Sequence, residues 1–503
     1  MVHSAMINYS VILGLLIPAA TIAGLMLVVH RETILHPLAI VSSLVSFVTA
    51  SVIAYFVFAG KSYAIVIDQI WISAIGAKIK LGIEPISAAM IWITAFSTLL
   101  AVAASFRDLR EKRESSISIA FHYLLIFLIQ LALMGFFMAR DLLLLFVCYE
   151  TVLIPMYLLI LVWGGKERVY ASVKFLIFTL FGSLPLLLSI AAVSIVAWQV
   201  NGELIFDIDR LIQMNFSENA SRWLFAGFAL AFLVKVPLWP LHTWLPDAHT
   251  EAPTAGSILL AGVLLKMGGY GLLAVVIPMF PSAAIDAAPI MITFALCGIL
   301  LGALASLAQK DAKRLIAYSS VSHMAFVVLG LFSFTAEAWS GAVFQMVAHA
   351  ISTGGLFYFV GALYRRRHDR MLESFGGLAT LAPGLCSFAG VLIFSSLAFP
   401  GTAGFAAEFM VLYGAFIYQP VVAILAAPVV ILSASYMLKF FKAIAFGTPT
   451  AEFAESWNGA HKEEIAVVAF CALLLVAIGV APWQSLMKNI EPSVISILSA
   501  VSR

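Results

Sequence analysis

Charge is scarce in this sequence. Only 11% of its 503 residues are Asp, Glu, Lys or Arg, whereas 63% are hydrophobic. Soluble domains average about a quarter charged residues, so a water-soluble globular fold is excluded. The formal net charge of +2 offers no broad basic surface for nucleic acid. We therefore expect a polytopic membrane protein with lipid, and not nucleic acid, around it.

Cysteine is also scarce, and its spacing excludes cysteine-based centres. No two cysteines have the spacing of a metal site or a redox pair, and no phosphate-binding loop or iron–sulfur or haem ligand pattern is present. We expect no metal and no cofactor in this chain, so any coupled redox chemistry belongs to another chain. The cysteines lie in separate apolar runs, at Cys148, Cys297, Cys386 and Cys471.

Long apolar runs fill most of the chain. A run of about 20 residues crosses the hydrocarbon of a bilayer as a helix, so we predict an all-α polytopic protein with about 14 transmembrane helices. No basic leader precedes the first span, which we expect to be retained. The predicted spans are 7–29, 35–58, 84–105, 117–138, 142–163, 171–198, 222–248, 253–278, 288–308, 313–334, 339–364, 385–418, 421–446 and 464–484.

Two of these spans are predicted to be broken helices. Pro240 interrupts 222–248 and Pro400 interrupts 385–418, and proline removes a backbone donor from a helix. The breaks lie five spans apart, and this odd offset predicts two inverted five-helix repeats, with the broken helices marking a transport pathway. The predicted segments are 1–116 with three helices, 117–280 with helices 4–8, 281–446 with helices 9–13, and 447–503 with a C-terminal helix and tail.

Basic residues are distributed unevenly between the loops. Lys and Arg favour cytoplasmic loops, so we predict that the odd-numbered loops are cytoplasmic and that both termini lie on the opposite side. The odd-numbered loops carry Arg31, Arg107, Arg110, Lys112, Arg113, Lys166, Arg168, Lys310, Lys313, Arg314, Arg365, Arg366, Arg367, Arg370 and Lys462. The even-numbered loops carry chiefly Lys61, Lys78, Lys80, Arg140, Arg210 and Arg222.

A small set of ionisable side chains lies within the predicted spans. Such groups are costly in hydrocarbon and mark ion paths unless they reach the interface. We interpret the lysines near span ends, at positions 174, 439 and 442, as interfacial because a long side chain can extend its charge into water. The full set is Glu150, Lys174, Lys235, Lys266, His323, His349, Glu408, Lys439 and Lys442.

Glu150 and Lys235 are predicted to act together. Glu150 lies deep in its span, and Lys235 lies deep in the first broken span, beside its break. An isolated buried charge of either sign is costly, so we hypothesise that the two form a pair. Burial lowers the pKa of a lysine and a nearby carboxylate raises it. Moving or neutralising Glu150 would then release a proton from Lys235.

Four further groups are candidates for carrying protons. Lys266 is mid-span among glycines, which leave space for a neighbouring backbone or for water. A buried histidine is often only a hydrogen-bonded core residue. However, His323 and His349 titrate near neutrality and are accompanied by Ser and Thr hydroxyls that can hold a water chain. Glu408 follows the second break and can exchange a proton with one aqueous side.

The link after the first break carries polar residues that resemble scattered metal ligands. They are His242, Asp247, His249 and Glu251. No spacing among them matches a metal motif, so we interpret them as helix-capping and interfacial hydrogen-bonding groups.

Three stretches of the chain resemble a known family. They are WPLHTWLPDAHTEAPTAGSILLAGVLLKMGGYG from Trp239, AYSSVSHMAF around His323 and FPGTAGFAAEF around Glu408. They are similar to the antiporter-like subunits of bacterial proton-pumping NADH:quinone oxidoreductase, respiratory complex I. The similarity is greatest to the subunit M group, whose mitochondrial counterpart is chain 4. The sister groups L and N have a lysine rather than a glutamate at the position of Glu408.

This resemblance implies a fold, a set of roles and a setting. It implies a 14-span subunit with two inverted five-helix repeats, in a bacterial inner membrane with periplasmic termini. Its partners would be other complex I membrane subunits, including sister antiporter-like subunits. NADH, FMN, iron–sulfur clusters and quinone would be bound by other subunits. The proton-path residues implied are Glu150, Lys235, Lys266, His323, His349 and Glu408.

Other functions remain open on the sequence. A sodium/proton antiporter subunit is one alternative, although sodium sites favour carboxylate and carbonyl oxygens over lysine and histidine. A membrane subunit of a hydrogenase complex is a second. An inert membrane scaffold is a third, but it would not need buried charges that each cost several kcal/mol.

Overall fold

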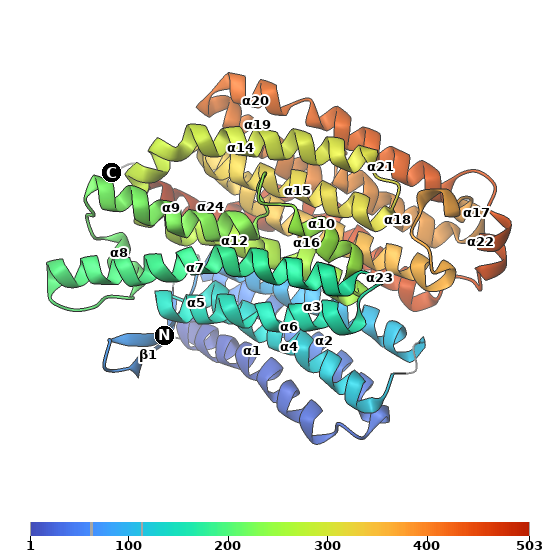
Figure 1. Cartoon of the computed structure of the whole chain (residues 1–503), viewed down its shortest axis with the longest axis horizontal. Coiled ribbons are helices and arrows are strands. Elements are labelled where there is room, and N and C mark those ends of the chain that lie inside the picture. The colour runs from blue at the N-terminus through green and yellow to red at the C-terminus, as the bar shows by residue number, and fades with distance from the viewer. Residues whose placement is uncertain (1, 61–63, 112–113, 502–503) are drawn as a thin grey trace.

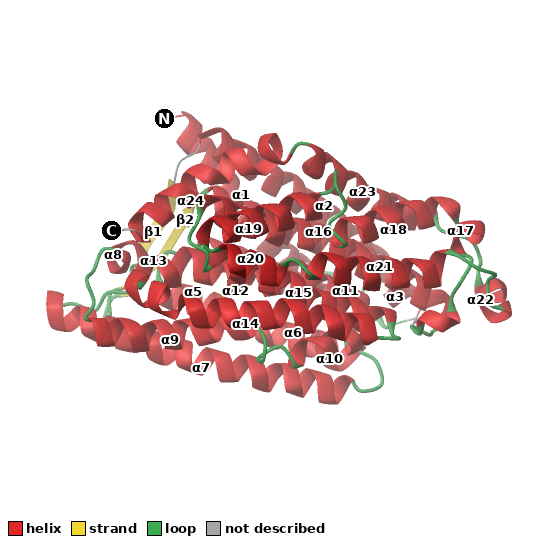
Figure 2. Ribbon diagram, turned by 90° about the horizontal axis from the view of Figure 1, so that it is seen from above, coloured by secondary structure: helices red, strands yellow, loops and turns green. Residues whose placement is uncertain are grey.

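The computed structural model describes residues 2–60, 64–111 and 114–501, and most of these residues are helical. Within them, twelve helices are long and apolar enough to cross a membrane, and two shorter apolar helices accompany them. The helices form one elongated bundle, with both termini at the same end (Figures 1 and 2). The predicted all-α polytopic fold is confirmed. Lys61, Lys112 and Arg113, which entered the loop comparison, lie outside the described residues.

The N-terminal segment contains three long helices and a hairpin. Its elements are α1 (Val2–Leu27), α2 (Glu32–Gly60), β1 (Ala64–Ile72), β2 (Ala77–Ile83) and α3 (Pro85–Glu111). The next elements contain the first broken span. They are α4 (Ser116–Met138), α5 (Leu142–Thr151), α6 (Leu153–Trp163), α7 (Arg168–Asn201), α8 (Ile208–Ile212), α9 (Glu218–Lys235), α10 (Trp244–Glu251), α11 (Thr254–Leu259), η1 (Leu260–Leu264), α12 (Leu265–Gly271), η2 (Leu272–Val276) and α13 (Ile277–Met279).

The remaining elements contain the second broken span and the C-terminal helices. They are α14 (Pro281–Ala308), α15 (Ala312–Leu331), α16 (Ala336–Arg367), η3 (Leu372–Ser374), α17 (Leu378–Leu381), α18 (Pro383–Ser396), α19 (Ala403–Tyr418), α20 (Pro420–Ala426), α21 (Val429–Ala445), α22 (Ala451–Ser456), α23 (Lys462–Val480), η4 (Trp483–Met487) and α24 (Lys488–Val501). Helices α11–α13 and α16 contain the most deeply buried spans, so they form the centre of the bundle.

Both predicted breaks are present. The first separates α9 from α10, and the second separates α18 from α19. The first break ends the helical hydrogen bonding of α9, and side chains from elsewhere take over two of its last carbonyls. The Tyr149 hydroxyl donates to the carbonyl of Ala231, and Trp244 Nε1 donates to that of Val234. The broken end is therefore stabilised within the protein rather than exposed to lipid.

Other interruptions were not predicted. Span 142–163 divides into α5 and α6 because Pro155 cannot donate to the preceding turn. Span 421–446 divides into α20 and α21 next to Pro428 for the same reason. The tail predicted after the last span was assigned no secondary structure from the sequence, and it contains helix α24.

The connection between the second and third spans is a β-hairpin rather than a loop. β1 pairs antiparallel with β2, and β1 is rich in isoleucine, which favours strands. Lys80 in β2 forms ion pairs of 2.8 Å with Asp207 and with Asp209. Burial opposes the charge of Lys80, but the hydrogen bonds to these carboxylates raise its pKa above the ordinary value. The hairpin is thereby joined to α8 at the end of the bundle that carries the termini (Figure 2).

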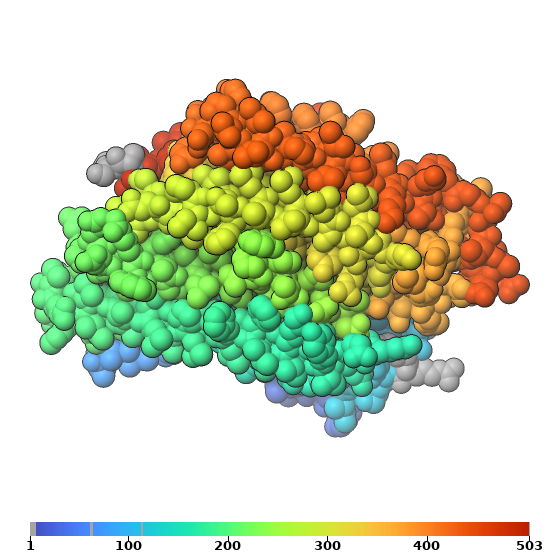
Figure 3. Space-filling model, turned by 45° about the horizontal axis from the view of Figure 1, so that its top comes forward, coloured from blue at the N-terminus to red at the C-terminus, as the bar shows by residue number. Residues whose placement is uncertain are grey.

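The opposite end of the bundle carries the odd-numbered loops, and we call it the basic face. It is defined by Lys313, Arg365, Arg366 and Arg370. The two arginines at 365 and 366 bind Glu464, which is completely buried, at 2.9 and 2.6 Å. This cluster joins the C-terminal end of α16 to the start of α23. Between the two ends, α7, α14 and α20 form part of the face seen in Figure 3. Many of their exposed side chains are apolar, as a lipid-facing surface requires.

Candidate functional site

Lys266 lies at the centre of the bundle, in α12 between the π-helical turns η1 and η2. π-Helical turns often occur at functional sites. The Lys266 side chain is completely buried, and its Nζ donates a hydrogen bond to the carbonyl of Ala261 in η1. The nearby Gly268 allows α12 to touch the end of α9, because a Cβ there would lie 2.4 Å from the carbonyl oxygen of Phe232. Lys266 and Lys235 therefore lie on touching helices.

A line of buried side chains extends from Lys266 into the second half of the chain. Lys266 Nζ lies 2.7 Å from Nδ1 of His349. The rings of His349 and His323 have centroids 5.7 Å apart. Nδ1 of His323 lies 2.9 Å from a carboxylate oxygen of Glu408. All four side chains are buried, so the line is shielded from lipid and from bulk water.

The second half of this line surrounds a very small polar cavity. Its volume is about 10 Å³, close to the space that one water molecule needs. Both histidines and Glu408 line it, with Ser395 and Ser396 beside them. The Nε2 atoms of both histidines have no hydrogen-bond partner among the described residues. The two rings can therefore exchange a proton through one bridging water across the gap between them.

Gln345 is a member of this site that sequence reasoning missed. Its Nε2 lies 3.4 Å from Nδ1 of His323, and its side chain is buried on α16. Gln345 lies four residues before His349. Residues four apart share one face of a helix, and this spacing was the available signal.

Lys235 is buried at the last position of α9, but it does not form the expected direct pair with Glu150. Among the described residues, no ion pair within 4.0 Å joins them. Instead, Lys235 Nζ lies over the Tyr149 ring, 4.7 Å from its centroid. Successive helical residues point about 100° apart, so Tyr149 faces Lys235 and Glu150 points aside. Glu150 is half-buried, and its charge still attracts Lys235.

The lysines interpreted as interfacial differ in their surroundings. Lys442 is exposed. Lys439 donates to the carbonyls of Leu307 and Gln309 at the end of α14, at 2.7 and 3.0 Å. Lys174 forms an ion pair of 2.6 Å with Asp247, and Arg314 lies 3.5 Å from the same carboxylate. These three lysines lie apart from the buried line.

Replacing Lys174 with alanine is expected to have a mild effect. Lys174 is about one fifth exposed, and Arg314 remains beside Asp247 after the change. Partly exposed ion pairs contribute little, so we expect proton-coupled turnover above about half that of the wild type. The measurement is turnover per assembled protein in membranes. Loss of activity in this variant would show that Lys174 is a functional rather than an interfacial residue.

The polar link around α10 was interpreted as capping and interfacial, and for His249 this is wrong. Its side chain is fully buried, and its ring stacks on Phe357 with centroids 4.7 Å apart. The cause is that α10 folds back into the bundle after the break. Lys313 was counted as a loop residue, but it is buried and donates to the carbonyl of Ala252. Within the described residues, no group of three or more His, Cys, Asp or Glu side chains is arranged to hold a metal ion.

Comparison with known sequences and structures places this geometry among relatives. Residues 139–434 match the family model described as NADH:quinone oxidoreductase/Mrp antiporter, transmembrane. The chain is similar to NADH-quinone oxidoreductase subunit M of Rickettsia prowazekii, with 37% identity over 92% of each chain. It is also 39% identical to subunit M of Pseudomonas aeruginosa, over 82% of this chain and 81% of the relative. The Escherichia coli subunit M is 37% identical over 82% of each chain.

Solved structures have the same fold. A chain of respiratory complex I from Thermus thermophilus with bound NADH matches with a TM-score of 0.85 and 30% identity, covering 98% of this chain and 99% of that one. A chain of the Mrp complex from Dietzia sp. matches with a TM-score of 0.84 and 20% identity, covering 100% and 99%. The latter match concerns the fold alone. The buried line described above lies entirely within the residues that match the family model.

Proposed function

Because this chain belongs to the NADH:quinone oxidoreductase/Mrp antiporter family, we propose that its buried line of titratable side chains is the proton path of a redox-driven pump. Like its subunit M relatives, the chain is a proton-translocating membrane-arm subunit of NADH:quinone oxidoreductase, respiratory complex I. It is thus one subunit of a translocase. The finer proposals concern which residues carry the proton and how the path is controlled.

The observation that carries the proposal is the contact sequence Lys266, His349, His323 and Glu408. Each neighbouring pair is in direct contact or within the reach of one water. A proton released by Lys266 passes to His349, then to His323 and then to Glu408. Histidine is suited to the middle of such a path because its two nitrogens can accept on one side and release on the other. The acidic end releases the proton towards one aqueous side.

Glu150 and Lys235 control the path in this proposal. Glu150 attracts the Lys235 charge without forming a direct ion pair in the present arrangement. Quinone reduction elsewhere in the complex changes the charge near Glu150, and that change shifts the preference of Lys235 for its proton. Since α9 touches α12 at Gly268, the change at Lys235 is passed to the helix that carries Lys266. The switch needs only the Coulomb interaction between the Glu150 and Lys235 charges, which is strong in a low-dielectric interior.

We assign the cofactors and substrate sites of the complex to other chains. We place FMN, the iron–sulfur clusters and the NADH and quinone sites in other subunits. Partners of this chain are then the neighbouring membrane subunits, including sister antiporter-like subunits, together with lipid. The basic face is the cytoplasmic side of a bacterial inner membrane, so both termini are periplasmic, as the distribution of basic residues indicates. Residues 117–280 and 281–446 are the two inverted repeats.

Sodium dependence separates proton pumping from sodium/proton exchange. We expect NADH-driven acidification by sealed membrane vesicles to be the same in nominally sodium-free medium and in medium with added sodium. The reason is that the buried line consists of lysine, histidine and one carboxylate, which bind protons and form no sodium site. A requirement for sodium, with accumulation of the ion at the expense of NADH, would instead support the exchanger.

A further inference from the structure

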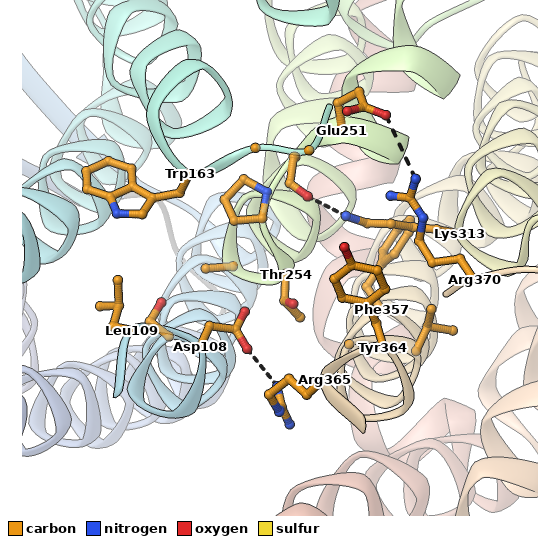
Figure 4. A pocket seen from close by; sticks show the side chains of 18 of the residues that line it. Asp108, Leu109, Trp163, Glu251, Thr254, Lys313, Phe357, Tyr364, Arg365 and Arg370 are labelled. Atoms are coloured by element: carbon orange, nitrogen blue, oxygen red, sulfur yellow. Dashed lines mark hydrogen bonds and ion pairs between the residues drawn. The ribbon is translucent and has the colours of Figure 1, made fainter. Parts of the chain in front are cut away.

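A cavity opens at the basic face, where α3, α10, α15 and α16 meet. Its volume is about 310 Å³, and its wall combines cationic and anionic side chains. Figure 4 shows Lys313 and Arg370 on one side and Trp163 on the opposite side, with Asp108 paired to Arg365. A cavity with this charged wall has both the space and the polar partners that water needs. It brings solvent into the bundle from the basic face.

A buried histidine adjoins this cavity. His249 stacks on Phe357, and Phe357 lines the cavity. The His249 side chain is fully buried, yet neither ring nitrogen has a hydrogen-bond partner among the described residues. A buried polar group left unpaired costs about 1–3 kcal/mol. An apolar side chain would pack at least as well there, so packing alone does not explain a histidine at this position.

The packing of α16 against α11 shows how deep in the bundle His249 lies. At the cavity, a Cβ on Gly361 would lie 2.5 Å from the Thr254 side chain. Deeper in the bundle, a Cβ on Gly354 would contact Ile258. Phe357 lies between these two glycines on α16. The Phe357 ring, on which His249 stacks, therefore lies at the inner edge of the cavity.

The inner part of the same helix leads to Lys266. His349 precedes Phe357 on α16 by eight residues, which corresponds to about 12 Å along the helix axis. His349 contacts Lys266 directly. The charged and titratable groups that act on the His249 ring are Lys313 from α15, Lys266 from α12 and His349 from α16. His249 thus lies, in depth along α16, between the cavity and the buried line.

A second unpaired polar group lies at the inner end of the region between the cavity and Lys266. The hydroxyl of Ser97, on α3, is buried without a hydrogen-bond partner within the described part of the chain. It lies against Gly262, where a Cβ would come within 2.3 Å of the Ser97 oxygen. Gly262 adjoins Ala261, whose carbonyl binds Lys266. Unpaired buried groups of this kind are ordinarily satisfied by ordered water. Polar groups that can hold water therefore occur at both ends of the region between the cavity and Lys266.

Resting on the pumping function proposed above, we propose that His249 carries protons from the cavity at the basic face to Lys266. One ring nitrogen takes a proton from cavity water while the other nitrogen gives its proton to water on the Lys266 side. The ring is neutral before and after the step, so no charge is left in the core. Phe357 lines the cavity and stacks on the ring, so the imidazole lies between the cavity water and the Lys266 side.

The test compares His249→Leu with the wild-type complex in membranes. Leucine keeps an apolar contact with Phe357 but cannot carry a proton. Turnover from NADH to quinone is measured from pH 6 to pH 8 with an uncoupler present, so that both sides share one pH. We expect turnover of the variant at pH 8 to fall at least about tenfold, since proton transfer through a positioned group contributes about 10²–10⁴-fold. The ratio of variant to wild-type turnover should then rise as the pH falls, because uptake without the relay depends on proton concentration.

Two controls make the result specific. His242→Leu changes a half-buried histidine of the same link and should leave turnover near that of the wild type. NADH oxidation with a water-soluble electron acceptor, which needs no proton movement, measures the amount of assembled complex. If the leucine variant does not assemble, His249→Gln takes its place with the same expectations, because an amide also cannot carry a proton.

Several outcomes would overturn the proposal. Wild-type turnover in an assembled His249 variant would show that protons bypass the residue. A loss by the same factor at every pH would show a structural role. Lys266→Ala, measured in parallel, separates this proposal from the pumping function. If Lys266→Ala loses coupled turnover and the His249 variant does not, only the role of His249 is wrong.

Discussion

Replacing Lys266 with alanine lowers quinone reductase turnover and proton pumping together, each by at least about tenfold. Lys266 is completely buried on α12, which touches α9 at Gly268, and its Nζ lies 2.7 Å from Nδ1 of His349. Alanine removes both the proton carrier and the hydrogen bond to Nδ1 of His349. Because redox chemistry and proton transfer are coupled in a pump, a blocked path slows electron transfer as well. The measurements are NADH oxidation and vesicle acidification in the same membranes.

Lys442→Ala is the matched control for this substitution. Lys442 is also a lysine in a membrane-spanning helix, but its side chain is exposed. We expect turnover and pumping close to the wild-type values, since an exposed charge contributes little to stability. If the two alanine variants were equally active, Lys266 would be a structural lysine.

Replacing Lys235 with alanine has the second large expected effect. Lys235 is buried beside the break, over the ring of Tyr149, and its removal deprives Glu150 of the nearby charge with which it interacts. We expect coupled turnover to fall by at least about tenfold, while the complex assembles, because cation–π contacts stabilise a structure by only about 1–2 kcal/mol. Full activity in this variant would refute the proposed switch.

Glu150→Gln tests the other half of the same switch. The amide keeps the size of the side chain and removes its charge, so Lys235 loses the attraction that Glu150 exerts. We expect coupled turnover to fall, as for Lys235→Ala. The double variant should have a turnover no lower than that of the less active single variant. Additive losses would show that the two residues act independently.

Identification of the buried line was possible from sequence because ionisable residues are so few in the spans. Lys266, His323, His349 and Glu408 stood out as ionisable side chains within spans, with nearby glycines, hydroxyls or a helix break as further signals, and the prolines predicted both broken helices. The contacts between them could not be predicted in the same way. Lys235 was expected to meet Glu150, but the rotation of α5 turns Tyr149 towards it. Such a rotation depends on packing between helices that are distant in sequence.

Two departures from the sequence-based expectations have different causes. His249 was interpreted as interfacial because it lies among polar residues, yet the break returns α10 to the bundle and buries the ring. Apolar neighbours such as Trp244 and Leu245, both buried, were the available signal. The hairpin was not predicted because its strands are far shorter than a membrane span, although the isoleucine-rich stretch of β1 favours a strand.

The most direct test of the proton path is simultaneous measurement of NADH oxidation and proton translocation in sealed vesicles carrying Glu408→Gln. Glutamine can still accept a hydrogen bond from His323, which lies 2.9 Å from the carboxylate, but it cannot bind and release a proton. With assembly verified by NADH oxidation using a water-soluble acceptor, we expect both rates to fall together, as the proposed proton path requires. Unchanged pumping per NADH oxidised at an unchanged rate would contradict it, because protons would then leave the protein without Glu408.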